Sequence, residues 1–348
     1  MVRIGIVGCN YGRTVHIPAF RLDSRCKIQA IAATDPARAA EAASACDVPL
    51  HFGNWRELVE HREVDAVVIA TPPPAQPEIA MRALDLGKPV LAEKPMAADV
   101  EGALAMLQRA GQKGRPSMVD FNFAEVMSWQ RAKGILDDGG IGALRHVFVT
   151  WNVENYATRH RTGWKSSTTR GGGALFNLVS HSFYYLEWFC GPIVEMSAQL
   201  SALPGEPRLD EATVVLSLKF ASGATGGLCM SSASYLGSGH RLEFYGEDGS
   251  LALINETREY MRGFRLFHAR RPAASLDEID TQDELERRYQ DDRVAPTSRI
   301  ATRFLDAIER GTRAHPDFAA GYRVQLLLDA ARQSNQSRTW IETPVSEP

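Results

Sequence analysis

Residues 1–13 of this 348-residue chain read MVRIGIVGCNYGR. The short apolar run at 3–8 ends in glycine and is typical of a strand that is buried on both faces. The turn Gly8-Cys9-Asn10-Tyr11-Gly12-Arg13 follows, and glycine there allows a tight turn into a helix. The start of that helix would offer N–H groups and positive dipole to a phosphate. The stretch therefore predicts a dinucleotide-binding turn.

The glycine spacing is imperfect, because Asn10 and Arg13 stand at the second and third positions of G-x-G-x-x-G. Asn tolerates a positive φ better than most residues, so the turn can survive. A plain strand–helix turn is the alternative interpretation.

Strand and helix signals alternate over the first 120 residues. Apolar runs that indicate buried strands lie at 27–32, 65–70, 89–92 and 117–121, and helical segments lie at 36–46, 75–86 and 99–112. Buried strands that are separated by helices predict a parallel, doubly wound α/β sheet.

The pattern changes after residue 120. Partly alternating segments at 144–153, 212–220, 224–232, 240–246 and 250–254 predict antiparallel hairpins, and helices are expected at 128–137, 175–189, 299–310 and 322–334. The charged stretch 273–296 has little periodicity and is expected to be an irregular segment on the surface. We therefore predict two domains, residues 1–120 for nucleotide binding and an α+β domain over 121–348.

Composition excludes several classes of protein. Lys and Arg number 39 against 42 Asp and Glu, a net charge of −3 that argues against nucleic-acid or anionic-membrane binding. Five cysteines without a C-x-x-C pair and nine scattered histidines predict neither disulfides nor a catalytic metal. The apolar start predicts a strand rather than a signal peptide, so a cytoplasmic protein is expected.

Asp35 follows the second predicted strand, about 20 residues after the glycine turn, where an acid binds the adenosine ribose. Its charge would repel a 2′-phosphate, so NAD(H) is the preferred cofactor. Arg38 nearby could favour NADP(H), but a place on a solvated helix face is the preferred interpretation of this residue. Asp35-Pro36 is also a good helix N-cap pair, which is the structural alternative.

Three further segments carry a family resemblance: Ala70-Thr71-Pro72-Pro73, Glu93-Lys94-Pro95, and the stretch from Gly171-Gly172-Gly173 to His181. In this order they resemble the glucose–fructose oxidoreductase / inositol dehydrogenase (Gfo/Idh/MocA) family over nearly the whole chain. The resemblance implies a Rossmann domain, an open-faced, mainly antiparallel second sheet and a homodimer or homotetramer. It also implies hydride transfer between a nicotinamide and a carbinol or keto carbon of a sugar, cyclitol or sugar nucleotide.

The resemblance places the chemistry on Lys94, His181 and Asn177. Lys94 follows a strand's carboxyl end and would stabilise charge on the reacting oxygen. Asn177 and His181 are four residues apart, so a helix puts them on one face, where His181 would relay the proton. Asn177 replaces the family's acid, and Gln76 stands where many members carry histidine. A core histidine is the alternative for His181.

The expected binding residues follow. Those for the cofactor are Gly8, Asn10, Tyr11, Gly12, Arg13, Asp35, Ala70, Thr71, Pro72, Gln76, Glu93 and Lys94. Those for the substrate are Lys94, Asn122, Tyr156, Trp164, Asn177 and His181. Two alternatives stay open: a non-catalytic, dinucleotide-sensing regulator or subunit, and the same fold used for redox-neutral hydrolysis or imine reduction.

Overall fold

The structure is a computed structural model that describes residues 1–348 except 155–163, 167–170, 202–210 and 344–348. The chain forms two compact units, one of Met1–Asn122 with Arg288–Gln325 and one of Phe123–Arg287 with Leu326–Pro348. The predicted boundary at residue 120 placed 288–325 with the second part, whereas this segment packs into the first unit. The functional division into two domains stays a prediction.

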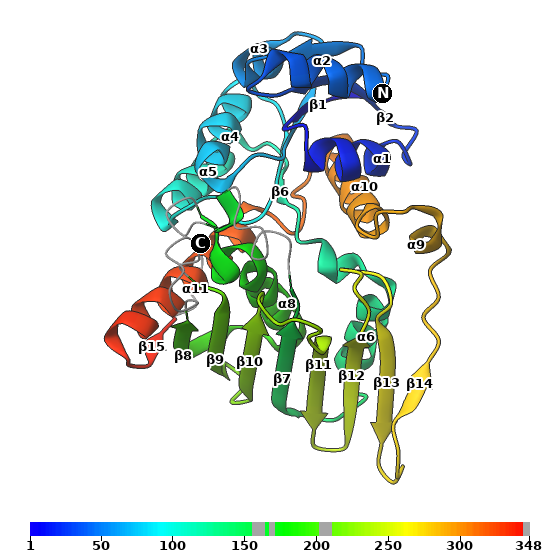
Figure 1. The fold of residues 1–348 in the computed structure, drawn as a ribbon, viewed down its shortest axis with the longest axis vertical. Helices are drawn as coiled ribbons and strands as arrows, with labels where there is room; N and C mark the ends of the chain where they lie inside the picture. Colours follow the sequence, from blue (N-terminus) through cyan, green and yellow to red (C-terminus); the bar gives the residue numbers. More distant parts are fainter. Residues whose placement is uncertain (155–163, 167–170, 202–210, 344–348) are drawn as a thin grey trace. The chain divides into compact units, whose positions relative to one another are not determined.

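The first unit is built on a six-stranded parallel sheet (Figure 1). Its strands are β1 (Val2–Val7), β2 (Cys26–Ala32), β3 (Leu50–Phe52), β4 (Ala66–Ile69), β5 (Val90–Ala92) and β6 (Ser117–Val119). The order is β3-β2-β1-β4-β5-β6, and every pair is parallel. This confirms the doubly wound prediction. The order reverses between β1 and β4, and ligands of open α/β sheets bind beyond the carboxyl ends of strands at such a point.

Short helices connect these strands. They are a π-helical segment (Gly12–His16) that continues into α1 (Ile17–Phe20), α2 (Pro36–Ala45), α3 (Trp55–Glu60), α4 (Gln76–Asp85) and α5 (Val100–Lys113). Asp35 and Asp99 cap α2 and α5 through bonds from Ala37 N (2.9 Å) and Gly102 N (2.7 Å). Sequence patterns missed β3 and α3, because both are short and polar residues interrupt them, so neither gives an apolar run or a periodic signal.

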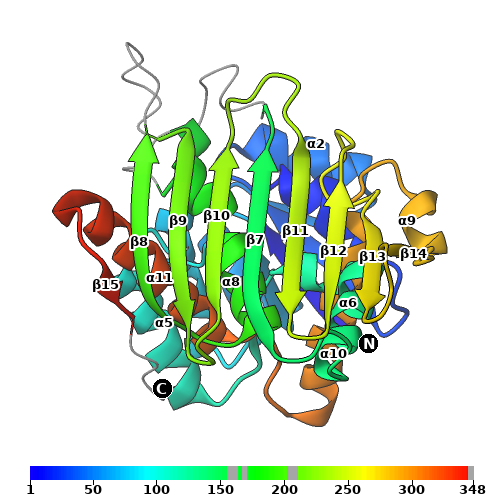
Figure 2. The ribbon, with the colours of Figure 1, turned by 90° about the horizontal axis from the view of Figure 1, so that it is seen from below.

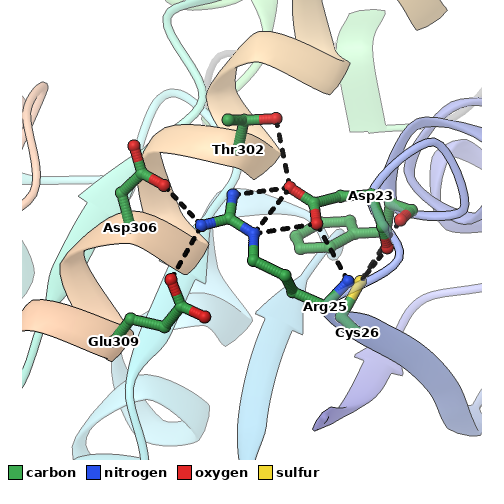
Figure 3. Close-up of polar contacts among 7 residues, drawn as sticks. Asp23, Arg25, Cys26, Thr302, Asp306 and Glu309 are labelled. Atoms are coloured by element: carbon green, nitrogen blue, oxygen red, sulfur yellow. Dashed lines mark hydrogen bonds and ion pairs between the residues drawn. The ribbon is translucent and has the colours of Figure 1, made fainter.

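Helix α10 (Val294–Arg310) completes the first unit from far along the chain. Phe304 of α10 is fully buried, and its ring meets that of Phe20 edge-to-face with centroids 6.5 Å apart. Arg25, which precedes β2, donates to Asp23, to Asp306 at 2.6 Å and to Glu309 at 2.9 Å (Figure 3). These ion pairs are partly exposed and contribute about 0–1 kcal/mol each, so the buried apolar contacts hold the helix.

The second unit contains a nine-stranded sheet (Figure 2). Its strands are β7 (Leu144–Asn152), β8 (Ile193–Ser201), β9 (Thr213–Phe220), β10 (Thr225–Ser231), β11 (Gly239–Gly246), β12 (Gly249–Asn255), β13 (Arg265–Arg270), β14 (Asp277–Ile279) and β15 (Ile341–Glu342). The order is β14-β13-β12-β11-β7-β10-β9-β8-β15, and only β7–β10 is parallel among these described pairs. The mainly antiparallel prediction is confirmed.

One face of this sheet is covered and the other is open. Helices α6 (Met127–Asp137) and α8 (Ser180–Cys190) lie behind the sheet in Figure 2, and no described helix of this unit lies in front of it. Residues along β9 alternate between buried and exposed, as a half-buried strand requires.

The charged stretch 273–296 has more structure than predicted. It contains β14, α9 (Glu284–Arg288) and the buried start of α10. The remaining helix, α11 (Phe318–Ser337), packs its last turns on β8 through Ser334 and Asn335. Among the residues that the structure describes, no helix has the length and hydropathy to cross a bilayer.

Candidate functional site

The turn after β1 requires glycine at two positions, although its glycine spacing departs from the strict motif. Gly8 has a φ of +118°, and a Cβ atom there would overlap the carbonyl oxygen of Ala70 at the end of β4. A Cβ on Gly12 would lie 2.7 Å from Ile6 Cγ2, so Gly12 supplies the close helix–strand packing. Asn10 has no positive φ, contrary to the tolerance that its position suggested. It instead accepts a hydrogen bond from Arg38 at 2.8 Å.

Asp35 stands exposed after β2, at the same edge of the sheet. Its Oδ1 atom accepts the N–H of Ala37, so the capping role is observed. Because Asp35 is exposed, capping of α2 does not exclude a contact with a ribose, and that contact stays a prediction. Arg13 faces Glu41 at 3.8 Å and is also exposed.

The Glu93-Lys94-Pro95 turn continues β5 at this edge. Glu93 N donates to Ile69 O at 2.9 Å, and Lys94 N donates to Glu93 Oε2 at 3.3 Å. Gln76 is fully buried, and its amide donates to Pro95 O at 2.8 Å. Gln76, predicted to contact cofactor, therefore fixes this turn to the start of α4; its contact with a cofactor stays a prediction.

Beneath the two turns lies a buried polar group, which we call the His16 cluster: His16, Glu93 and Asp120. His16 Nε2 is 2.9 Å from Glu93 Oε1, and the three side chains bring N and O atoms within 4.8 Å of one another. His16 is fully buried and Asp120 is 1% exposed. Sequence patterns missed His16 and Asp120 because their partners are distant along the chain.

The donor types of the His16 cluster are those that divalent metals accept. However, His16 Nε2 and Glu93 Oε1 are bonded to each other, and the Lys94 charge interacts with Glu93 and would oppose a second cation. The geometry therefore favours a hydrogen-bonded group. That the chain uses no catalytic metal stays a prediction.

Residues at the start of α10, together with Asn122, contact the glycine turn at this edge of the sheet. Asn122 Nδ2 donates to Tyr11 Oη at 3.1 Å and to Thr297 Oγ1 at 3.0 Å. The guanidinium of Arg293 lies 5.0 Å from the centre of the Tyr11 ring. Burial, with the Glu93 and Asp120 charges, raises the pKa of the Tyr11 phenol well above its usual value. Asn122, predicted to bind substrate, is thus bonded within the first unit, and Tyr11 stays neutral.

The second unit holds the other two predicted catalytic residues, Asn177 and His181. Asn177 lies in a π-helical segment (Leu175–Val179) that continues into α8, where His181 follows. Both are buried, with 6% and 3% of their surface exposed, and the His181 ring meets Phe123 edge-on at 4.9 Å. π-Helical turns occur often at functional sites.

Gly173, which precedes this helix, has to be glycine for a steric reason. Gly173 has a φ of +82°, and a Cβ there would lie 2.6 Å from Glu211 Oε1. The same carboxylate accepts the N–H of Leu175 at 2.9 Å, so buried Glu211 caps the helix that carries Asn177 and His181. Sequence patterns missed Glu211, and no local signal points to it.

The remaining predicted residues are scattered over both units. Ala70 and Thr71 are half-buried, Pro72 is exposed, and Trp164 is half-buried in a short 3₁₀ turn (Trp164–Ser166). Tyr156 lies outside the described residues. Whether any of them contacts a ligand stays a prediction.

Comparison with known proteins identifies the class. Residues 2–121 match the family described as "Oxidoreductase family, NAD-binding Rossmann fold", and residues 129–252 match the GFO/IDH/MocA C-terminal domain. These two matches, together with the fold, define an NAD-binding Rossmann-type oxidoreductase. The chain belongs to the GFO/IDH/MocA family.

Individual similar proteins also carry names of oxidoreductases or dehydrogenases. An uncharacterized oxidoreductase of Synechocystis sp. is 33% identical, covering 98% of this chain and 96% of its own. Levoglucosan dehydrogenase of Pseudarthrobacter phenanthrenivorans is 26% identical over 90% and 89% of the two chains. A solved levoglucosan dehydrogenase in complex with NADH and L-sorbose superposes with a TM-score of 0.88 at 23% identity, covering 99% of both chains, which bears on the fold.

The glycine turn gives a test with a matched control. Gly8→Ala should lower the free energy of unfolding by about 3 kcal/mol or more, because it forces a left-handed alanine against the Ala70 backbone. Gly111→Ala, in helix α5 with no atom within 4 Å of its added Cβ, should raise it by about 0.5–1 kcal/mol. Urea denaturation followed by circular dichroism measures both. Equal stability of the two variants would contradict this geometry.

Proposed function

We propose that the chain is an NAD(H)-dependent oxidoreductase that moves a hydride between nicotinamide and a carbinol or keto carbon of a sugar, cyclitol or sugar nucleotide. One observation carries the proposal: the His16–Glu93 hydrogen bond joins the helix after the glycine turn to the turn that bears Lys94. A phosphate-binding turn and a positioned ammonium at one sheet edge are what this chemistry needs. Relatives named as levoglucosan and inositol dehydrogenases support the substrate class.

The residues present fit a dinucleotide. Gly8 and Gly12 bring no side chains to the turn, so the backbone at these two positions and the following helix can approach a pyrophosphate. Asp35 is exposed after β2, at the place where its carboxylate would accept hydrogen bonds from a ribose diol. When bound, the nicotinamide supplies the hydride donor or acceptor.

Lys94 is proposed to act on the reacting oxygen. Its side chain is half-buried in the turn that Gln76 and Glu93 fix, which limits the conformations that the ammonium can adopt. An ammonium held there donates a hydrogen bond to the carbinol or carbonyl oxygen and stabilises developing negative charge.

His181 is proposed to carry the proton, with Asn177 orienting its ring. The neutral Asn177 amide can orient the imidazole but cannot balance its charge, as the family's acid would. Glu211 keeps the start of this helix in place.

Self-association is proposed through the open face of the second sheet. Phe148, Val215 and Tyr245 are large apolar side chains on this face with about 40% of their surface exposed. A second copy that covers this face would remove them from water and give a homodimer or homotetramer.

The proposal is tested first at Lys94. Lys94→Ala should keep NADH affinity and lower kcat by about 10²–10⁴, because it removes a positioned electrophilic or proton-transfer group. Lys88→Ala is the matched control, since Lys88 precedes β5 at its other end and donates to Val59 O and His61 O. The assay is a screen of sugars, cyclitols and nucleotide sugars with NAD(H) and NADP(H). Normal turnover in Lys94→Ala would remove this residue from the mechanism.

Cofactor preference is tested at Asp35. The wild type should bind NADH about 5–150-fold more tightly than NADPH, from a like-charge penalty of about 1–3 kcal/mol. Asp35→Asn keeps the oxygen acceptor that caps α2 but removes the charge. It should therefore reduce the ratio of NADH affinity to NADPH affinity without weakening the helix. Fluorescence titration with both reduced cofactors measures this. Equal affinities in the wild type would refute the preference.

The pair Asn177 and His181 is tested through pH. Asn177→Asp should move the acidic limb of the kcat/KM profile upward by about one pH unit, because a nearby carboxylate stabilises the imidazolium and delays its loss of a proton. His181→Ala should abolish that limb and slow turnover. If Asn177→Asp leaves the profile unmoved and His181→Ala stays active, the two residues are structural and the dinucleotide-sensing regulator gains support.

A further inference from the structure

Tyr11 is the residue of the glycine turn that contacts the later part of the first unit. It is the N-cap of the π-helical segment Gly12–His16, at the point where the turn becomes the helix. A pyrophosphate that binds such a turn is held by backbone N–H groups of this stretch. The side chain of Tyr11 therefore anchors backbone groups on which cofactor binding depends.

The hydroxyl of Tyr11 is tied to α10 through Asn122. The Nδ2 group of Asn122 donates to Tyr11 Oη at 3.1 Å and to Thr297 Oγ1 of α10 at 3.0 Å. Asn122 is 2% exposed and Thr297 is fully buried, so water does not readily replace either partner. Breaking such a contact leaves a buried polar group unsatisfied, which makes the contact costly to lose.

The ring of Tyr11 is covered by Arg293, which precedes α10. The guanidinium carbon lies over the ring, 5.0 Å from its centre. The guanidinium is itself fixed by a two-pronged pair with Asp291, from Nε to Oδ1 at 2.8 Å and from Nη2 to Oδ2 at 2.6 Å. Burial lowers the pKa of Arg293, but the bonds to Asp291 outweigh burial and Arg293 stays a cation. A planar cation that is oriented in this way favours one position of the ring.

We propose that Arg293 is a positioning residue for the dinucleotide: it holds the Tyr11 ring, and through it the glycine turn, in the conformation that binds the pyrophosphate. The inference deepens the proposed function and rests on it only for the place where the cofactor binds. It assigns to residues 288–325, which join the first unit from far along the chain, control over cofactor affinity.

The two side chains of the turn that carry polar groups are held differently. Asn10 is bonded to Arg38 at an exposed position, where water competes for both partners. Tyr11 is held by buried groups on one side and by the paired Arg293 on the other. A turn that loses this hold samples other conformations, and its apparent affinity falls in proportion to the fraction that remains competent to bind. We therefore expect the loss of Arg293 to appear as weaker cofactor binding.

The test measures cofactor binding to the full-length protein without any substrate. NADH is titrated by fluorescence, and ADP-ribose, which carries the pyrophosphate without nicotinamide, is titrated by calorimetry. Arg293→Met removes the cation, Arg293→Lys keeps the charge without the planar fork, and Tyr11→Leu removes the ring. Arg310→Met, at an exposed arginine at the other end of α10, is the matched control. Circular dichroism and urea denaturation check that each variant folds.

Arg293→Met should raise the Kd of both ligands about 5–30-fold, the equivalent of about 1–2 kcal/mol. Arg293→Lys should raise it nearly as much, because an ammonium cannot form the two-pronged pair with Asp291. Tyr11→Leu should raise it at least as much as Arg293→Met. The double variant Tyr11→Leu/Arg293→Met should bind no more weakly than Tyr11→Leu alone, because the contact is already lost. Arg310→Met should bind as the wild type does.

Three results would overturn the inference. An unchanged Kd in folded Arg293→Met would remove Arg293 from cofactor binding. A wild-type Kd in Arg293→Lys would show that charge alone matters and would reject the positioning role. A double variant whose loss equals the product of the two single losses would show that Arg293 does not act through Tyr11. The side chain of Arg293 is 32% exposed, so its two variants decide the matter even if Tyr11→Leu does not fold.

The readout separates this inference from the proposed function. Weaker binding in Arg293→Met, in a protein that binds NADH but transfers no hydride to any sugar or cyclitol, would uphold the positioning role and reject the oxidoreductase proposal. Hydride transfer by a protein whose NADH affinity is unchanged in Arg293→Met would do the reverse. A wild type that binds neither NADH nor ADP-ribose would reject both.

Discussion

A single part-buried hydrogen bond, between His16 and Glu93 at 2.9 Å, joins the two turns on which the candidate site depends. One turn follows β1 and the other follows β5, so the bond crosses the place where the strand order reverses. It forms because parallel strands deliver their carboxyl ends to one edge of the sheet. The ends of β1, β4 and β5 are also tied by backbone bonds, from Ala70 N to Val7 O and from Glu93 N to Ile69 O. The chemistry that we propose for Lys94 is thus placed at an end of the sheet that these backbone bonds hold together.

The second support for this edge comes from far along the chain. Helix α10 packs Phe304 into the core of the first unit, and its first turns bring Arg293 and Thr297 to Tyr11 and Asn122. The dinucleotide-type unit is therefore not continuous in sequence. The second unit uses a comparable device, because a buried carboxylate, that of Glu211, anchors the helix that carries Asn177 and His181. In both units a buried acid accepts N–H groups and fixes the backbone beside a predicted catalytic residue.

Sequence patterns suffice for most of the fold, because buried parallel strands read as apolar runs and half-buried hairpins alternate. They fail where an element is short and polar residues interrupt it, as at β3 and α3, or where the segment is highly charged, as at β14 and α9. The site divides in the same way. Lys94 and Glu93 are predictable from a local motif, whereas His16, Asp120 and Glu211 act through partners that only the folded chain brings near. Gln76 has a structural role that the local sequence does not indicate, since its amide holds a turn; its contact with a cofactor stays a prediction.

The central claim is that the carboxyl edge of the first unit's sheet binds a nicotinamide dinucleotide with the reacting ring beside Lys94. A crystal structure of the protein grown with NADH tests it most directly. The account predicts the pyrophosphate on the N–H groups of the Gly8–Gly12 turn, the adenosine ribose hydroxyls on Asp35, and the Lys94 ammonium within about 3–4 Å of the nicotinamide or of a ligand atom stacked on it. A dinucleotide bound elsewhere, or a nicotinamide ring directed away from Lys94, would contradict it.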